Sequence, residues 1–116
     1  MHELGLVSGI LETVTAAARE AGALRVVSVT LRIGDLREVV PESLDLAWEV
    51  LGEEDPLTAG SELVVEEVHP RSRCLACGAE FDHDRFHLRC PECGSAATTL
   101  LAGRELQIVS MEVDLP

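Results

Sequence analysis

Apolar residues recur every three or four positions over residues 3–21 of the 116-residue chain. This period is typical of an amphipathic helix that buries one face, and the following Gly22 is a common helix stop signal. The stripe can serve either the core of a domain or a contact between two copies of the chain. Its members are Leu4, Val7, Leu11, Val14 and Ala18, with Leu6 and Ile10 beside them.

The period changes from helical to alternating over residues 24–33. This segment is rich in β-branched residues and therefore predicts a strand, which Gly34-Asp35 ends. Alternation divides the strand into two faces, one with Val27, Val29, Leu31 and Ile33 and the other with Val26, Ser28, Thr30 and Arg32.

A second helix is predicted from Pro41, which suits a first helical turn because its missing N–H is not needed there, to Gly52. An acidic loop follows, then strands at residues 63–68 and about 105–113, on either side of a cysteine-rich segment. The pattern predicts an α+β fold, with two helices packed on a small mixed three-stranded sheet.

The last strand must return to this sheet from beyond the cysteines. Residues 70–103 are therefore predicted to form an inserted zinc-ribbon module with four cysteines rather than a tail. We expect an α/β domain at residues 1–69, completed by the strand of residues 104–116, and a zinc-ribbon domain at residues 70–103.

The predicted ribbon contains two Cys-x-x-Cys-Gly motifs separated by twelve residues. Two thiolates three positions apart in a tight turn can ligate one ion, and the following glycine permits a left-handed backbone that points amides at sulfur. Strands around Phe81 and Phe86 would form the hairpin between the motifs. The predicted ligands of one structural metal ion are Cys74, Cys77, Cys90 and Cys93.

Other interpretations of the cysteines fit less well. Disulfides are rare in cytosolic proteins, and a redox dithiol would explain only one of the two motifs. Iron also accepts four thiolates, but the spacing and composition favour zinc. Because the protein supplies all four ligands, no position is open for water activation, and we expect a structural ion whose removal unfolds the ribbon.

Charge and composition exclude several classes of protein. The net charge is −12, and all nine cations are arginine, so nucleic acid and anionic membranes are disfavoured partners. No apolar run could span a bilayer and no signal peptide is evident, which predicts a cytoplasmic protein. Without a phosphate loop, nucleophile elbow or open zinc triad, we expect no enzyme activity.

The first three residues form a second candidate metal site. A free amine at Met1, the following backbone amides and the imidazole of His2 can surround one ion in a plane, which suits Ni(II) or Cu(II). Glu3 adds a nearby charge, although a carboxylate also suits the first turn of a helix. An isolated histidine at position 2 is more often an ordinary surface residue.

Taken together, these motifs resemble the HypA family of hydrogenase and urease nickel incorporation proteins, over essentially the full length. The features that carry the resemblance are Met1-His2-Glu3, Arg32-Ile33-Gly34-Asp35-Leu36, Val40-Pro41-Glu42-Ser43-Leu44, the two Cys-x-x-Cys-Gly motifs and Gly103-Arg104-Glu105-Leu106.

The resemblance implies a nickel metallochaperone that carries Ni(II) as cargo and Zn(II) as a structural ion. It implies nickel binding by His2, the Met1 amine and the backbone amides of His2 and Glu3, with zinc on the four cysteines. Expected partners are a HypB-type GTPase and the large subunit of nickel-iron hydrogenase or its maturation complex, with urease as the other client and a homodimer as a further expectation.

The chain departs from the family in one respect. Some members carry histidines beside the cysteine motifs, where this chain has Gly78 and Gly94, so a pH-sensing zinc site is not expected. His69, His83 or His87 could supply an extra nickel ligand or be exposed ribbon residues. The alternative to a nickel chaperone is a zinc-ribbon adaptor that binds another protein and does not transfer nickel.

Overall fold

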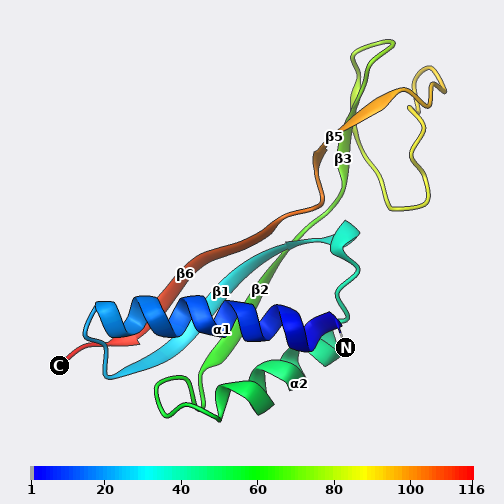
Figure 1. Ribbon diagram of the computed structural model, residues 1–116. Coiled ribbons are helices and arrows are strands. Elements are labelled where there is room, and N and C mark those ends of the chain that lie inside the picture. Colours follow the sequence, from blue (N-terminus) through cyan, green and yellow to red (C-terminus); the bar gives the residue numbers. More distant parts are fainter. Residues whose placement is uncertain (1) are drawn as a thin grey trace. The chain divides into compact units, whose positions relative to one another are not determined.

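The computed structural model describes residues 2–116 and contains two helices and two three-stranded sheets in this part of the chain (Figure 1). The elements are helix α1 (His2–Glu20), strand β1 (Arg25–Gly34), the 3-10 helix η1 (Asp35–Arg37), helix α2 (Pro41–Gly52) and strands β2 (Glu62–Val68), β3 (Arg71–Cys74), β4 (Glu80–Asp82), β5 (Thr98–Ala102) and β6 (Leu106–Asp114).

The chain divides into two compact units. One contains the chain up to Leu31, Val39–Val65 and Ile108–Pro116, and the other contains Arg32–Glu38 and Glu66–Gln107. The second unit therefore includes a short segment from the end of β1 and η1 in addition to the cysteine-rich part. The assignment of nickel binding to residues 1–69 and 104–116 remains a prediction. The assignment of zinc binding to residues 70–103 also remains a prediction.

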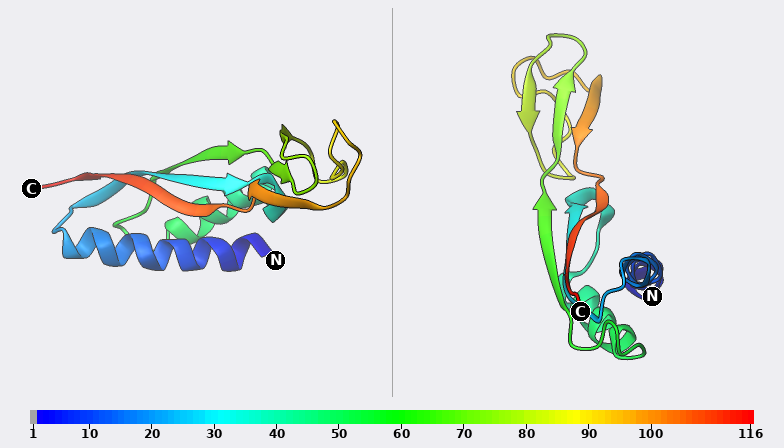
Figure 2. Two further views of the ribbon diagram at one scale, coloured as in Figure 1. Left: turned by 90° about the horizontal axis from the view of Figure 1, so that it is seen from above. Right: turned by 90° about the vertical axis from the view of Figure 1, so that its left-hand side faces the viewer.

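The first unit is built on a sheet with the strand order β2-β1-β6. Strands β1 and β2 run in the same direction and β6 runs in the opposite one (Figure 1), which confirms the predicted mixed three-stranded sheet. Helices α1 and α2 lie on the same face of this sheet (Figure 2). The α+β class and the helix from Pro41 to Gly52 are confirmed.

The core of this unit lies between the helices and the sheet. Val7 and Val14 of α1, Leu44 of α2 and Leu31 of β1 are almost fully buried, as expected when one apolar face of each element meets the others. The alternation in β1 is regular from Val29 onward, but at its start Val26 is buried and Val27 is half-buried. The irregularity coincides with the Val26 N–H donating to the Leu57 carbonyl at 2.7 Å.

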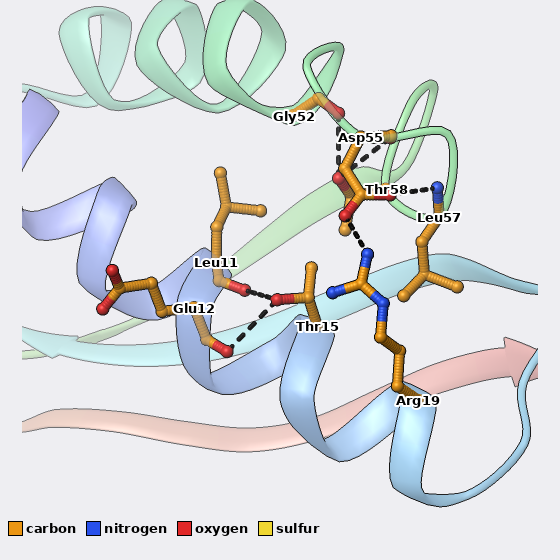
Figure 3. Close-up of polar contacts among 8 residues, drawn as sticks. All are labelled: Leu11, Glu12, Thr15, Arg19, Gly52, Asp55, Leu57 and Thr58. Atoms are coloured by element: carbon orange, nitrogen blue, oxygen red, sulfur yellow. Dashed lines mark hydrogen bonds and ion pairs between the residues drawn. The ribbon is translucent and has the colours of Figure 1, made fainter.

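The loop after α2 is fixed by polar contacts (Figure 3). Arg19 of α1 forms an ion pair with Asp55, and Asp55 also accepts a hydrogen bond from the Leu57 N–H at 2.9 Å. The buried Thr58 hydroxyl donates to the Gly52 carbonyl at 2.8 Å. The predicted acidic loop is therefore held in place within the first unit by these contacts.

The second unit contains a small antiparallel sheet with the order β4-β3-β5. The hairpin between β3 and β4 places Ser72 opposite Phe81. The prediction of a strand around Phe86 is wrong, because residues 83–97 form turns and loops in which the Asp84 carboxylate accepts hydrogen bonds from the backbone N–H groups of Phe86 and His87. Strand β5 supplies the third strand instead.

Two glycines meet where β1 ends and β5 is followed by β6. The Gly34 N–H donates to the Glu105 carbonyl at 2.8 Å, and the Leu36 N–H donates to the Gly103 carbonyl at 2.9 Å. A Cβ atom at Gly34 would overlap the backbone of Gly103. Gly34 is therefore required for this close backbone approach. No helix within residues 2–116 is long and apolar enough to cross a membrane.

Candidate metal centre

The first cysteine turn follows directly from β3. Cys74 is the last residue of this strand, and its Sγ accepts a hydrogen bond from the Cys77 N–H at 3.4 Å. The turn closes through the Gly78 N–H, which donates to the Cys74 carbonyl at 2.9 Å. Gly78 has φ +81°, a left-handed conformation that glycine adopts without steric cost. The glycine after the motif thus performs its predicted role.

The second cysteine turn repeats this arrangement. The Gly94 N–H donates to the Cys90 carbonyl at 2.8 Å, and the Cys90 N–H donates to the Ser95 carbonyl at 3.0 Å. Gly94 has φ +75°. In each turn the first cysteine, Cys74 or Cys90, is buried, and the second, Cys77 or Cys93, is exposed.

The four sulfur atoms lie within 4.8 Å of one another. Two pairs of Sγ atoms are 3.6 Å apart, Cys74 with Cys93 and Cys77 with Cys90. A zinc–sulfur bond of about 2.3 Å requires sulfur atoms about 3.8 Å apart in a regular tetrahedron. The four cysteines thus fit a four-coordinate metal ion whose ligands are all thiolates.

The turns also prepare one thiol for ligation. The Cys77 N–H, followed by a smaller contribution from the Ala76 N–H, lowers the pKa of Cys74 to about 6. For Cys77 the Ala79 N–H lowers the pKa, but the Cys90 thiol, desolvation and the other two thiols together raise the pKa to about 12. Four adjacent sulfur atoms do not all ionise by themselves, so a bound cation must displace the remaining protons.

Little apolar packing supports the cysteine turns. Cys74, Cys90 and Phe81 form a small buried cluster, against which Ala79 packs. Leu75, Phe86 and Leu88 are exposed, Phe86 by 75 %, although the Arg85 guanidinium lies 5.1 Å from the centre of the Phe86 ring. A cluster of this size contributes little free energy of folding.

The N-terminal nickel prediction involves two residues that the structure describes. Met1 lies outside the described residues. His2 begins α1 and is exposed, whereas Glu3 is 7 % exposed. Among residues 2–116, the four cysteines form the one group of three or more metal-ligating side chains close enough to share an ion.

The other three histidines are engaged in hydrogen bonds. His69 Nδ1 lies 2.7 Å from an Asp35 carboxylate oxygen, and His87 Nδ1 lies 2.8 Å from Asp84. His83 uses both ring nitrogens, since Nδ1 is 2.6 Å from the Asp84 carbonyl and Nε2 is 2.7 Å from the Ser72 hydroxyl. His83 would have to break two hydrogen bonds before its ring nitrogens could both be free.

Two features of the second unit were missed by the sequence analysis. The buried Ser72 holds His83 beside Phe81, with ring centroids 5.5 Å apart. In addition, Arg32–Glu38 belongs to this unit, and Arg85 of the loop pairs with Glu38 at 3.2 Å. Gly34, the last residue of β1, was a usable signal for the position of Arg32–Glu38, because glycine in or beside a strand often marks a close backbone approach.

Comparison with known proteins agrees with this geometry. Residues 1–113 match the family model described as hydrogenase/urease nickel incorporation, metallochaperone, hypA. A protein of Chlorobium luteolum named hydrogenase maturation factor HypA is 37 % identical over 114 residues, which cover 98 % of this chain and 97 % of that protein. A protein of the same name from Streptomyces avermitilis is 43 % identical over 113 residues, covering 96 % and 86 % of the two chains.

Two solved structures share the fold. The solution structure of the Ni metallochaperone HypA from Helicobacter pylori superposes with a TM-score of 0.69 and 20 % identity, covering 98 % of each chain. A second solution structure, of a HypA protein, gives a TM-score of 0.73 with 22 % identity over 97 % of this chain and 96 % of that one.

Proposed function

Because this chain belongs to the HypA family of nickel metallochaperones, which act in hydrogenase maturation, we propose that it binds one Ni(II) ion at its N-terminus and transfers that ion to a hydrogenase precursor. The proposed ligands are the Met1 amine, the His2 imidazole and the backbone amides of His2 and Glu3. Nickel is cargo in this proposal and not a resident cofactor.

The observation that carries the proposal is the position of His2 as the exposed first residue of α1. The first four N–H groups of a helix have no partner within the helix. The amides of His2 and Glu3 can therefore lose their protons to nickel without breaking helical hydrogen bonds. Nitrogen ligands in a plane are the coordination that Ni(II) favours.

The buried Glu3 supports a division of roles between neighbouring residues. The residue is 7 % exposed, so we propose that Glu3 contributes its backbone amide while its side chain stays packed in the first turn of α1. A carboxylate in the first turn also interacts favourably with the helix dipole. His2 alone then presents a side chain to the ion.

We propose that the four cysteines hold a structural zinc ion. Sγ separations of 3.6 Å and a complete set of four protein ligands support this assignment. With no position left for substrate or water, the bound zinc would supply folding free energy and no catalysis. The proposal therefore includes no enzymatic activity.

Transfer requires a site that gives up its ligands one at a time. A terminal site can exchange the amine, the amides and the imidazole stepwise for ligands of an acceptor. Because nickel binds the deprotonated groups, acid favours release. We propose a HypB-type GTPase and the hydrogenase large subunit as the cytoplasmic partners in this exchange, with urease as the other client.

The test measures Ni(II) binding to the zinc-loaded, untagged chain by calorimetry and by d–d absorption. We expect one specific nickel ion per chain with a square-planar spectrum, and we expect its loss in His2→Ala and in a chain whose α-amine is blocked by an N-terminal extension. His87→Ala is the matched control, since it removes an exposed histidine far along the sequence.

Equal binding by the blocked and unblocked chains would move the nickel site away from the N-terminus. Absence of specific binding in every form would leave a zinc-ribbon adaptor as the better function. Zinc content, measured in the same samples, must stay at one ion per chain for either comparison to count.

A further inference from the structure

Helix α2 carries large apolar side chains on its outer side as well as on its buried side. The buried side packs Leu44, Ala47 and Trp48 into the core of the first unit. On the outer side, Leu46 and Val50 are 60 % and 55 % exposed. Residues four positions apart are neighbours on a helix surface, so these two side chains form one apolar strip, here named the α2 strip. A surface helix normally presents polar residues to water on this side.

Carboxylates lie along one side of the α2 strip. Glu42, Asp45 and Glu49 follow one another at spacings of three and four residues, which places them in one row on the helix, and all three are exposed. Within residues 2–116, none of the three takes part in an ion pair. Glu49 also lies in the last turn of α2, where a negative charge interacts unfavourably with the helix dipole. The charge of Glu49 therefore does not stabilise the helix that carries it.

A cavity of about 370 Å³ adjoins this acidic row. Asp45 and Glu49 line it from α2, and Ser61 and Leu63 line it from the segment that enters β2. Trp48 forms part of the wall and is held there by its indole N–H, which donates to the Ser61 hydroxyl at 3.1 Å. The cavity thus combines apolar surface with carboxylates, which suits the hydrocarbon stem and the charged end of an arginine or lysine side chain.

The whole first unit is acidic around this surface. It contains twelve of the 21 acidic residues and two of the nine arginines, and so carries −10 of the net charge of −12. Between Arg37 and Arg71 the chain has ten acidic residues and no arginine or lysine. Complementary charge selects partners and speeds their encounter. The occupant of this surface is therefore a cationic protein segment, since nucleic acids, anionic membranes and a second acidic chain are repelled.

We propose that the outer face of α2 binds an amphipathic helix of another protein that is rich in arginine or lysine. Apolar residues of that helix at spacings of three and four pack on Leu46 and Val50, and one of its cations enters the cavity beside Trp48. A helix is favoured over a strand, because the backbone of α2 is occupied by its own hydrogen bonds and offers no edge for strand pairing. The surface is separate from the ligands of the proposed nickel site.

A synthetic peptide tests this surface through its apolar pattern. The probe is about 18 residues long, enough to form a helix, and consists of alanine, leucine and arginine with leucine at every third or fourth position. Its control has the same composition, but the leucines are distributed around the helix. Fluorescence anisotropy with the zinc-loaded chain should show at least about tenfold tighter binding of the patterned peptide. General attraction by the acidic chain is the same for both peptides.

Substitutions in the apolar strip locate the contact. Leu46→Ser should weaken binding of the patterned peptide about tenfold and leave the control peptide unaffected. Leu24→Ser is the matched variant, because Leu24 is 65 % exposed in the same unit but precedes β1, and it should bind as wild type does.

Substitutions of single charges test the acidic row. Glu49→Gln should weaken binding of the patterned peptide about threefold and make it less dependent on salt. Glu20→Gln removes the same charge at the exposed end of α1, and its effect should be smaller.

The single tryptophan of the chain reports on the cavity. The indole N–H signal of Trp48 in NMR spectra should shift when the patterned peptide is added and stay in place with the control peptide. His2→Ala should bind the patterned peptide as wild type does, which separates this surface from nickel binding. Circular dichroism and zinc content matched to wild type confirm that each variant is folded.

Three results would overturn the proposal. The first is equal affinity for the two peptides, which would reduce the interaction to general attraction between opposite charges. The second is equal weakening by Leu46→Ser and Leu24→Ser, or by neither, and the third is an unmoved Trp48 signal at saturation. Either of the last two would place the contact away from α2.

Discussion

Gly34 lies so close to Gly103 that a Cβ atom on Gly34 would overlap the carbonyl group of Gly103. The two segments are held by hydrogen bonds from Gly34 to Glu105 and from Leu36 to Gly103. Because the obstacle is backbone and not a flexible side chain, the structure cannot absorb even one methyl group there. This contact connects two of the motifs by which the family is recognised.

Gly34→Ala should therefore lower the free energy of unfolding by about 3 kcal/mol. Gly9→Ala is the control, because no atom lies within 4 Å of a Cβ at that position in α1. Alanine there should raise stability by roughly 0.5–1 kcal/mol. Urea denaturation of both variants gives the comparison, and equal stability of Gly34→Ala and wild type would contradict the close approach.

The His69–Asp35 pair predicts a pH dependence. The Asp35 carboxylate, by hydrogen bond first and by charge second, raises the pKa of His69 above 6.5. A raised pKa in the folded state means that the pair stabilises fully below the unfolded value of about 6.5. That stabilisation is lost as the pH rises through the folded pKa.

Titration of the His69 ring by NMR tests this directly. We expect a midpoint above 6.5 in wild type and a lower one in Asp35→Asn, which keeps the shape of the side chain but removes its charge. The other histidine signals serve as internal references. An unchanged midpoint in Asp35→Asn would show that the contact does not persist in solution.

Removing the metal should affect the two units differently. The cysteine cluster has little apolar support, so chelation should unfold β3, β4 and β5. Trp48 reports on the first unit, because it is 3 % exposed and its indole N–H donates to the Ser61 hydroxyl at 3.1 Å. Its fluorescence should stay that of a buried indole.

Backbone NMR spectra recorded with the fluorescence complete this test. Cys74→Ser should give the same pattern as chelation, with lost zinc and lowered solubility. Well-dispersed signals from the ribbon after complete zinc removal would disprove the metal dependence, and exposure of Trp48 would show that the first unit also depends on the ion.

The Arg19–Asp55 ion pair fixes the loop after α2 to α1. The Leu57 N–H, then the Arg19 guanidinium, lower the pKa of Asp55 below 3.8. A lowered pKa means that the contribution to stability is present above the unfolded value of about 3.9 and is lost as the pH falls through the folded one.

Asp55→Asn should thus be less stable than wild type at pH 7, and the difference should shrink in acid. Thermal unfolding of Asp55→Asn, Arg19→Gln and the double variant is measured at pH 7 and at acid pH. The double-variant comparison separates the contribution of the Arg19–Asp55 ion pair from that of the turn that Asp55 makes with Leu57. A difference that does not change with pH would show that the charge of the Asp55 carboxylate contributes nothing to stability, through either the ion pair or the turn.

The sequence by itself determined the elements whose signals are local. The period of the apolar residues located both helices and the three strands of the main sheet, because a buried face requires that period. The two Cys-x-x-Cys-Gly motifs predicted the metal centre, since the spacing and the left-handed glycines are properties of a short segment. The N-terminal motif by itself suited Ni(II) or Cu(II), and only its combination with the rest of the chain favoured nickel.

Only the tertiary structure decided the features that depend on residues distant in sequence. Phe86 has the apolar character of a strand residue, but Asp84 hydrogen bonds turn its segment into a loop, and β5 pairs with β3 instead. The burial of Ser72 and the contact of Gly34 with Gly103 also depend on strand pairing across many residues. No local pattern specifies such pairing, because it arises from the joint packing of the whole sheet.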